Sequence, residues 1–366
     1  MTKDVNITYK KDEEHSFFFV LNQRVNDYFV SNKLSKKTNG FGIFKTIFFC
    51  ACFILLYSFV ILAHGNNLQL LICYPLIGFI QICLVLNAGH EGVHDSFSNN
   101  KTINHLFAYT FDLLGSSGYL WKMRHIYSHH PNPMVPGKDV DIEQTGMLTF
   151  MPMENPPNIF KFQKVYAPIL YCFYTLNAIL KRDWTDFFSN KIGHKVVKHS
   201  KKEAVSFVVS KIIYFTYALV LPLLLSGCTW PTVLFGFFLM HLAASVSAAV
   251  ALFPAHLYEE SIFPSPDNEH GHLNTTWSEH QMSVTMDFGT RLPFVAFFFG
   301  GINYHAVHHL FPSVSHVHFP EIRKILDATA LDFNIPYNHR PSLNTAVISH
   351  WRLLRKNGVA HMNEII

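Results

Sequence analysis

The chain has 366 residues, of which 35 are Phe and only 15% are charged. This composition is typical of a membrane protein or of an unusually apolar enzyme. The formal net charge of +4 is too small to indicate a nucleic-acid-binding protein. The 23 histidines are in excess of ordinary usage, and their positions therefore need an explanation.

Four apolar segments are long enough to cross a bilayer, which takes about 20 mostly apolar residues. They lie at about 42–63, 68–88, 205–225 and 231–253. The linkers "HGNN" and "SGCTW" are short and uncharged. The segments therefore predict two helical hairpins that span the membrane.

Lysines precede each hairpin, and they predict its orientation. The first hairpin follows Lys33, Lys36, Lys37 and Lys45, and the second follows Lys191, Lys195, Lys198, Lys201 and Lys202. Because cytoplasmic loops carry an excess of Lys and Arg, both charged sides are expected in the cytoplasm, together with both termini. The basic run 191–202 is also a candidate to dock a reductant, although attraction to anionic lipid is the favoured explanation.

The predicted organisation has three parts. Residues 1–40 form a cytoplasmic N-terminal segment, 41–340 a membrane domain, and 341–366 a C-terminal helix and tail. The stretches 103–121 and 160–180 are apolar but interrupted by polar residues, so we expect interfacial or half-buried helices there. If either one crossed the membrane, the histidine clusters described next would lie on opposite sides.

Histidines gather in "GHEGVHDSFS" (89–98), "RHIYSHHPNP" (124–133) and "NYHAVHHLFP" (303–312). On helices, the i, i+4 spacing puts the rings of each cluster on one face. The eight rings belong to His90, His94, His125, His129, His130, His305, His308 and His309. A single HxxxH pair more often packs or caps than binds metal. Three such clusters on one membrane face indicate a metal site instead.

Neutral imidazole offers one nitrogen lone pair, and it suits Zn, Cu, Fe and Ni. Eight rings exceed the four ligands of a tetrahedral zinc ion. The number of ligands therefore favours a dinuclear centre, and dioxygen activation at such a centre would favour iron.

With "HEGVH", "HIYSHH" and "HAVHH", the chain resembles the membrane fatty acid desaturase family, the histidine-box diiron enzymes. The flanking stretches "HHPNPMVPGKDVDI", "WSEHQMSVTMDF" (277–288) and "GGINYHAVHHLFPSVSHVHFPEI" (300–322) resemble its front-end or linoleoyl-CoA desaturase-like branch. The similarity runs from about residue 40 to 340. It implies an all-α integral membrane fold, with two hairpins of transmembrane helices and a cytoplasmic helical cap that carries the dimetal site.

The resemblance also implies a ninth ligand just after the fourth span, where His256 stands. Two positions depart from the family pattern. His305 stands where the front-end branch often has Gln. Leu252 stands where animal-type acyl-CoA desaturases have an Asn that holds a metal-bound water, which puts that contact in doubt.

Other polar residues are candidates to hold the ligand rings in place, because a ligating imidazole usually donates its second N–H to an acceptor. The carboxylate candidates are Asp95, Asp139, Asp141, Glu259 and Glu260, with interfacial solvation or helix capping as the alternative. In the family layout His280, His316 and His318 lie near the site, and Gln281 and Asn303 are further candidates. His241 lies inside the fourth span, where we expect a neutral ring bonded to a neighbouring helix. The small residues at 243–251 are expected to serve close helix packing, with an acyl-chain slot as the alternative.

The resemblance implies a fatty acid desaturase that forms a cis double bond with dioxygen and two external electrons at two iron ions. No catalytic residue is expected apart from the metal ligands. A fused cytochrome domain and a GxGxxG motif are absent from the sequence, so a separate ferredoxin or b-type cytochrome is the expected electron donor. The acyl carrier stays open between CoA, acyl-carrier protein and membrane lipid. The alternatives are a hydroxylase, ketolase or acetylenase on the same scaffold, or a non-catalytic membrane receptor.

Overall fold

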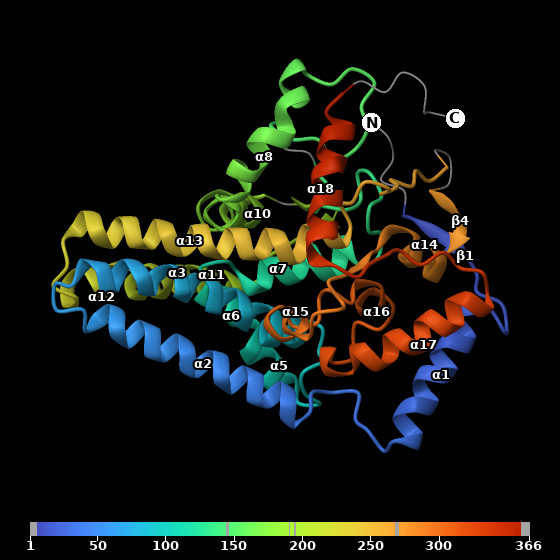
Figure 1. Ribbon diagram of the computed structural model, residues 1–366, viewed down its shortest axis with the longest axis horizontal. Coiled ribbons are helices and arrows are strands. Elements are labelled where there is room, and N and C mark those ends of the chain that lie inside the picture. The colour runs from blue at the N-terminus through green and yellow to red at the C-terminus, as the bar shows by residue number, and fades with distance from the viewer. Residues whose placement is uncertain (1–5, 144–145, 190, 194, 268–270, 360–366) are drawn as a thin grey trace.

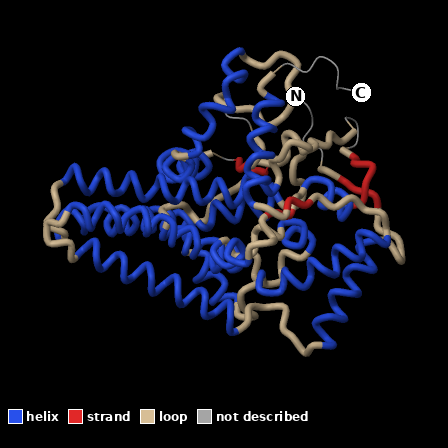
Figure 2. Tube along the Cα trace, viewed as in Figure 1, coloured by secondary structure: helices blue, strands red, loops and turns tan. Residues whose placement is uncertain are grey.

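The computed structural model describes residues 6–143, 146–189, 191–193, 195–267 and 271–359. Helices dominate it, and the few strands are short (Figure 2). Long helices lie side by side in a bundle, and shorter elements form a cap at one end of that bundle (Figure 1). The predicted all-α architecture is confirmed.

The bundle supplies the predicted membrane spans. Among the described residues, four stretches of helix are long and apolar enough to cross a bilayer: Gly40–Ile61, Asn67–Val93, Lys201–Leu225 and Trp230–Ala255. They comprise α2 (Gly40–Ile61), α3 (Asn67–Leu84), η1 (Val85–Gly89), α4 (His90–Val93), α11 (Lys201–Phe215), η5 (Thr216–Val220), α12 (Leu221–Leu225), α13 (Trp230–Leu252) and η6 (Phe253–Ala255). The stretches 103–121 and 160–180 are broken into shorter helices.

The outer surface of the bundle is apolar, as a lipid environment requires. Ile47 and Ile54 of α2 are each 62% exposed. At the far end of the bundle, the Gly65 N–H donates to the Ser226 carbonyl at 2.8 Å. The two short linkers therefore touch, and both hairpins turn on the same side.

Helices α3 and α13 approach each other closely because glycines stand at their contact. A Cβ at Gly78 would lie 2.0 Å from the Met240 carbonyl oxygen, and a Cβ at Gly236 would lie 2.6 Å from the Tyr74 ring. Small residues allow such backbone approach between membrane helices. This contact brings the ends of α3 and α13, and hence His90 and His256, to the same end of the bundle.

Two histidine clusters lie at π-helical turns, where the sequence predicts regular α-helix. η1 (Val85–Gly89) precedes the first cluster, and η2 (His125–His129) contains most of the second. The His130 N–H donates to the His125 carbonyl at 2.9 Å, which closes the wider turn. π-helical turns are often found at functional sites. In η2 the wider turn puts His125, His129 and His130 on the same side.

The cap surrounds the cluster end of the bundle. Its first half contains α1 (Phe17–Ser31), α5 (Lys101–Ala108), α6 (Thr110–Leu113), α7 (Gly118–Arg124), η3 (Asn158–Phe162), α8 (Gln163–Tyr171), α9 (Tyr174–Asn177), η4 (Ala178–Arg182) and α10 (Asp183–Phe188). Its second half contains α14 (Trp277–Val284), α15 (Pro293–Phe298), α16 (His305–Leu310), η7 (His316–His318), α17 (Phe319–Asp332) and α18 (Leu343–Asn357).

Three short strand pairs tie cap segments together. β1 (Thr8–Lys10) pairs in parallel with β4 (His272–Thr276), and β5 (Asp287–Phe288) pairs in parallel with β6 (His339–Arg340). β2 (Lys191–Ile192) pairs antiparallel with β3 (Lys195–Val196). α1 packs on α17 through a core that includes Leu21, Val25, Ile322 and Leu326. These contacts hold α14 and α16 against the end of the bundle.

Candidate metal centre

The fold brings all nine predicted histidines into one buried cluster. They come from the end of the second span, the α7–η2 segment, the end of the fourth span and α16. None of the nine is more than 9% exposed. Residues up to 219 positions apart in the chain, His90 and His309, thus meet at one place.

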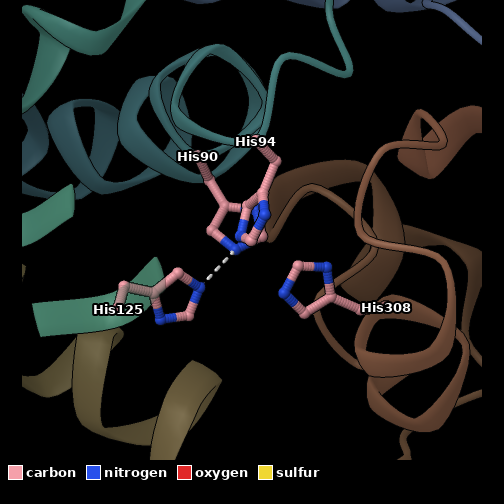
Figure 3. Close-up of side chains that lie close together, drawn as sticks. All are labelled: His90, His94, His125 and His308. Carbon is pink, nitrogen blue, oxygen red and sulfur yellow. Dashed lines mark hydrogen bonds between the residues drawn. The ribbon is translucent and has the colours of Figure 1, made fainter. Parts of the chain in front are cut away.

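The cluster divides into two groups of four. The first group is His90, His94, His125 and His308, and the second group is His129, His256, His305 and His309. Within each group the candidate ligand nitrogens all lie within 4.8 Å of one another. His130 lies beside both, in a set with His308 and His309. The rings of the first group point toward a common centre (Figure 3).

In the second group, every Nδ1 faces an oxygen that accepts a hydrogen bond. His129 Nδ1 lies 3.0 Å from Asp139 Oδ2, and His309 Nδ1 lies 2.8 Å from Gln281 Oε1. His256 Nδ1 lies 2.8 Å from the Val284 carbonyl, and His305 Nδ1 lies 3.1 Å from the Ile302 carbonyl. Each ring therefore carries a proton on Nδ1, and in a neutral ring the lone pair is on Nε2.

These lone pairs converge. His305 Nε2 lies 2.8 Å from His256 Nε2 and 3.1 Å from His309 Nε2, and His256 Nε2 lies 3.2 Å from His309 Nε2. Two lone pairs cannot hydrogen-bond to each other, so neutral rings in this arrangement need a cation at their centre. The side chains of the second group therefore fit a metal ion.

The rings of the first group pack against one another and against Trp121, and among the described residues none of them is oriented by a hydrogen bond from Nδ1. His125 stacks on Trp121 with ring centroids 4.2 Å apart, and His90 meets the same indole at 5.7 Å. His90 Nε2 lies 3.2 Å from His125 Nε2, and the buried His94 Nε2 is without a hydrogen-bond partner among the described residues. A buried nitrogen of this kind is costly unless something binds it. The first group thus fits a second ion.

The electrostatics also suit metal binding. Burial, together with the neighbouring imidazoles, lowers the pKa of His94, His125, His130, His305, His308 and His309. These rings are therefore neutral, as ligation requires. His129 differs: burial opposes its charge, but the Asp139 carboxylate and its hydrogen bond raise the pKa of His129 to about 9. A metal ion would displace the Nε2 proton, and the bond to Asp139 would persist.

Only some of the residues predicted to hold the histidine rings contact those rings in the structure. Gln281 contacts His309, and its amide also donates to the His130 carbonyl at 3.3 Å. Asp139 is fully buried against His129, whereas Asp141 is largely exposed and its carboxylate lies 3.6 Å from the same ring. Of the two neighbouring carboxylates, Asp139 therefore orients the ring.

The remaining candidates contact other groups. Asp95 accepts from the Asn104 amide at 3.1 Å, Glu259 pairs with Arg352 at 3.2 Å, and Glu260 pairs with Arg340 at 2.5 Å. Asn303 donates to the Phe288 carbonyl at 3.1 Å, and His280 Nε2 lies 3.0 Å from the Pro133 carbonyl. These contacts fix loops and helix ends around the cluster rather than the ligand rings themselves.

A buried set of hydrogen bonds joins the first histidine cluster to the segment that follows the third cluster. Glu91 Oε1 accepts from the His316 backbone N–H at 2.6 Å and lies 2.8 Å from His316 Nδ1. On the other side of that ring, Lys45 Nζ of α2 lies 2.9 Å from His316 Nε2. The segment after α16 is thereby held against α4. His241 is hydrogen-bonded to Thr175 at 2.9 Å and to Tyr214, which confirms its predicted structural role.

An apolar pocket reaches the cluster from the bundle side. It is lined by five of the nine histidines and by apolar residues of the spans, among them Ile82, Leu86, Phe111, Ile179 and Ala248. The exposed or half-exposed polar lining residues are Asp141, Asn177 and Arg182. The pocket therefore has a polar mouth and an apolar interior.

The structure adds detail to what the sequence predicts for Leu252 and for the small residues of α13. Leu252, at the position of the expected water-binding Asn, lines the apolar pocket. Ala248 also lines it, while Ala244 and Ala251 are buried in the neighbouring helix contact, so the small residues of α13 contribute to helix packing and to the lining of the apolar pocket. Trp121 was not a candidate, although its position one helical turn before His125 is a usable signal.

Comparison with known proteins shows similarity to fatty acid desaturases. A family model described as fatty acid desaturase matches residues 66–341. The sn-1 linoleoyl-lipid 6-desaturase of Synechocystis sp. is 30% identical over 359 residues, which cover 96% of this chain and 98% of that protein. The acyl-lipid (8-3)-desaturase of Physcomitrium patens is 29% identical over 360 residues, which cover 98% of this chain and 75% of that protein. The chain therefore belongs to the fatty acid desaturase family.

Proposed function

We propose that this protein is an acyl-lipid desaturase that forms a cis double bond, using dioxygen and two electrons from a separate carrier, at two iron ions held by nine histidines. One observation carries the proposal: in the second group all four Nδ1 atoms face oxygen acceptors, and the Nε2 lone pairs of His256, His305 and His309 converge where a cation would satisfy them. Imidazole ligands suit iron among other metals, and the family membership favours iron.

The substrate class follows from the pocket. Its apolar interior suits an acyl chain, and its polar mouth at Asn177 and Arg182 suits the ester and headgroup of a lipid. The Synechocystis and Physcomitrium relatives are named for acyl-lipid substrates, which supports a membrane lipid as the carrier. On this basis the carboxyl end of the chain lies at the mouth and the methyl end lies deep in the bundle.

The residues have separate tasks in this reaction. The bound metals supply dioxygen activation, which no amino-acid side chain provides. Leu86, Phe111, Leu252 and Ile302 form apolar walls that position the methylenes beside His90, His125 and His305 and exclude water. Asp139 and Gln281 keep the Nδ1 protons of His129 and His309 in place, so that Nε2 stays directed at the centre. The lysines that precede each hairpin favour a cytoplasmic location for the site.

The test combines metal analysis with lipid profiling. In a host without polyunsaturated lipids, the wild-type protein is expected to produce a new double bond, and the purified protein is expected to hold about two iron ions, one for each group. His308→Ala should abolish the product and lower the iron content. His105→Ala, on the exposed side of α5, is the matched control and should change neither.

Two outcomes would contradict the proposal. A product that carries an added oxygen atom, detected by mass spectrometry, would favour the hydroxylase or ketolase alternative. Purified protein that binds no metal and leaves the host lipids unchanged would favour a receptor.

A further inference from the structure

Two depressions reach the histidine cluster, and they share no lining residue. The apolar pocket described above touches His90, His125, His129, His256 and His305. A second, more open depression touches three of the other four rings, His94, His130 and His309. We call it the outer groove, and its defining residues are His94, Lys122, Tyr127, His130, Trp277 and His309. Each depression therefore reaches the cluster at a different set of histidines.

The outer groove does not suit an acyl chain. Its lining includes charged Lys122 and Asp95 as well as the edges of three imidazoles, whereas the other pocket continues into the apolar interior of the bundle. A second substrate path is therefore a poor explanation for the groove.

The groove reaches both groups of ligands. His94 belongs to the first group, His309 belongs to the second, and His130 forms a set with His308 and His309. An electron that arrives in the groove therefore meets a ligand of either metal position directly. Because electron transfer slows steeply with distance, this is the favourable place on the described surface for a donor to approach.

The rim of the groove is positively charged. Lys122 lines it, and Lys37 reaches it by donating to the carbonyls of Asp95 at 2.8 Å and Ser313 at 3.4 Å. Lys195 Nζ lies 5.2 Å from the centre of the Tyr127 ring. Asp95 also lines the groove, and its carboxylate accepts a hydrogen bond from the Asn104 amide at 3.1 Å. The charge complementarity favours an acidic partner.

Two aromatic side chains give the groove the character of a protein interface. Tyr127 is 40% exposed, and Trp277 is partly exposed beside it. Aromatic residues are enriched in the energetically important parts of interfaces, with charged residues at the rim.

We propose that the outer groove docks a small acidic protein that carries one electron at a time. The inference rests on the proposed function, in which –CH2–CH2– + O2 + 2 e− + 2 H+ gives –CH=CH– + 2 H2O. Two reduced carriers dock in turn, and each is oxidised by one electron. The acyl chain occupies the other pocket throughout, so donor and substrate bind at the same time.

The test uses the iron-loaded, full-length protein in lipid nanodiscs with reduced plant-type ferredoxin, an acidic carrier. Lys122→Glu and Lys195→Glu are expected to raise the KM for ferredoxin about tenfold each and to weaken its salt dependence, with kcat at saturating ferredoxin little changed. Lys122→Gln should give a smaller rise. Lys202→Glu, on the exposed start of α11, is the matched control and should leave the KM unchanged.

A second measurement separates docking from damage to the centre. When dithionite replaces ferredoxin in a single turnover, the Lys122→Glu and Lys195→Glu proteins should form as much double bond as the wild type and hold as much iron. A ferredoxin KM that is unchanged in both variants, or raised by Lys202→Glu instead, would overturn the docking site. Wild-type protein that forms no double bond with either reductant would overturn the proposed function, and the docking proposal with it.

Discussion

The two groups of histidines differ in what orients their rings. In the second group, Asp139, Gln281 and the carbonyls of Ile302 and Val284 accept a hydrogen bond from every Nδ1. Within the described residues, no hydrogen bond from Nδ1 orients a ring of the first group, and stacking on Trp121 takes that place for His125. The protein therefore sets the tautomer and direction of the second group before any metal binds, whereas the first group is oriented by packing.

This difference predicts that the two groups lose metal affinity to different extents when a residue that orients a ring is replaced. A hydrogen bond to the ring raises its basicity as well as fixing its orientation, and loss of such a partner typically costs 10–100-fold in metal affinity or activity. A stacked indole supplies orientation alone. The second group should thus bind its metal more tightly than the first, and the variants below either break or sharpen this contrast.

The largest effect is expected from removing one ligand of each group. His129→Ala and His308→Ala should each reduce desaturation by more than the roughly 100-fold expected for an outer partner. Mössbauer spectroscopy of protein loaded with iron-57 should show loss of one iron signal in each variant, and the lost signal should differ between them. Loss of the same signal from both would contradict the division into two groups.

The next largest effect is expected at Asp139. Asp139→Ala removes the acceptor of His129 and should weaken iron binding in the second group by roughly 10–100-fold. Competition with a chelator measures this. Glu259→Gln, at an exposed ion pair with Arg352, is the matched acid-to-neutral control and should have no effect. Asp139 also accepts hydrogen bonds from the Met134 and Asp141 N–H groups, and their loss can destabilise the fold. A thermal unfolding measurement therefore accompanies the chelator competition.

A smaller effect is expected at Gln281. Gln281→Leu removes the acceptor of His309 Nδ1 and should weaken iron binding in the second group by about tenfold. Gln281→Glu restores an acceptor and should recover most of the affinity. The first-group signal should remain unchanged in both variants. Equal weakening of both groups would show that Gln281 acts through the fold as a whole.

The smallest effect is expected at Trp121. An aromatic pair contributes about 0.5–1.5 kcal/mol, so Trp121→Leu should weaken first-group iron binding by roughly 2–10-fold. Because Trp121 also lines the apolar pocket proposed to hold the acyl chain, the KM for the acyl-lipid should rise as well. Trp184→Leu, which removes an indole stacked away from the cluster, is the control. If Trp121→Leu weakened iron binding in the second group alone, the conclusion that Trp121 orients the first group would be wrong.

Much of the site follows from local pattern. The four spans and the three clusters are visible because a span needs a long apolar run and because i, i+4 spacing puts two rings on one helical face. His256 was expected only from the resemblance to the family. Gln281 lies in a stretch that resembles the family, and its side-chain oxygen lies 2.8 Å from His309 Nδ1. Asp139 and Asp141 look equivalent in sequence, and only burial distinguishes them.

Other features have no local signal. The carbonyls of Val284 and Ile302 orient two rings, and every residue has a carbonyl, so their role depends on where the backbone passes. The π-helical winding of His125–His129 is set by how that segment packs against the bundle. The assignment of rings to two groups mixes the clusters, since His308 joins the first group and His309 joins the second.

The sequence by itself determined that this chain is an all-helical membrane protein with three histidine clusters at one end of its spans, because apolar length and helical spacing are local properties. The tertiary structure alone decided which rings form each group, which oxygen faces each Nδ1 of the second group, and which rings the apolar pocket and the outer groove reach. These depend on distances between residues far apart in the chain, and such distances are decided by packing, including the close approach of α3 and α13 at Gly78.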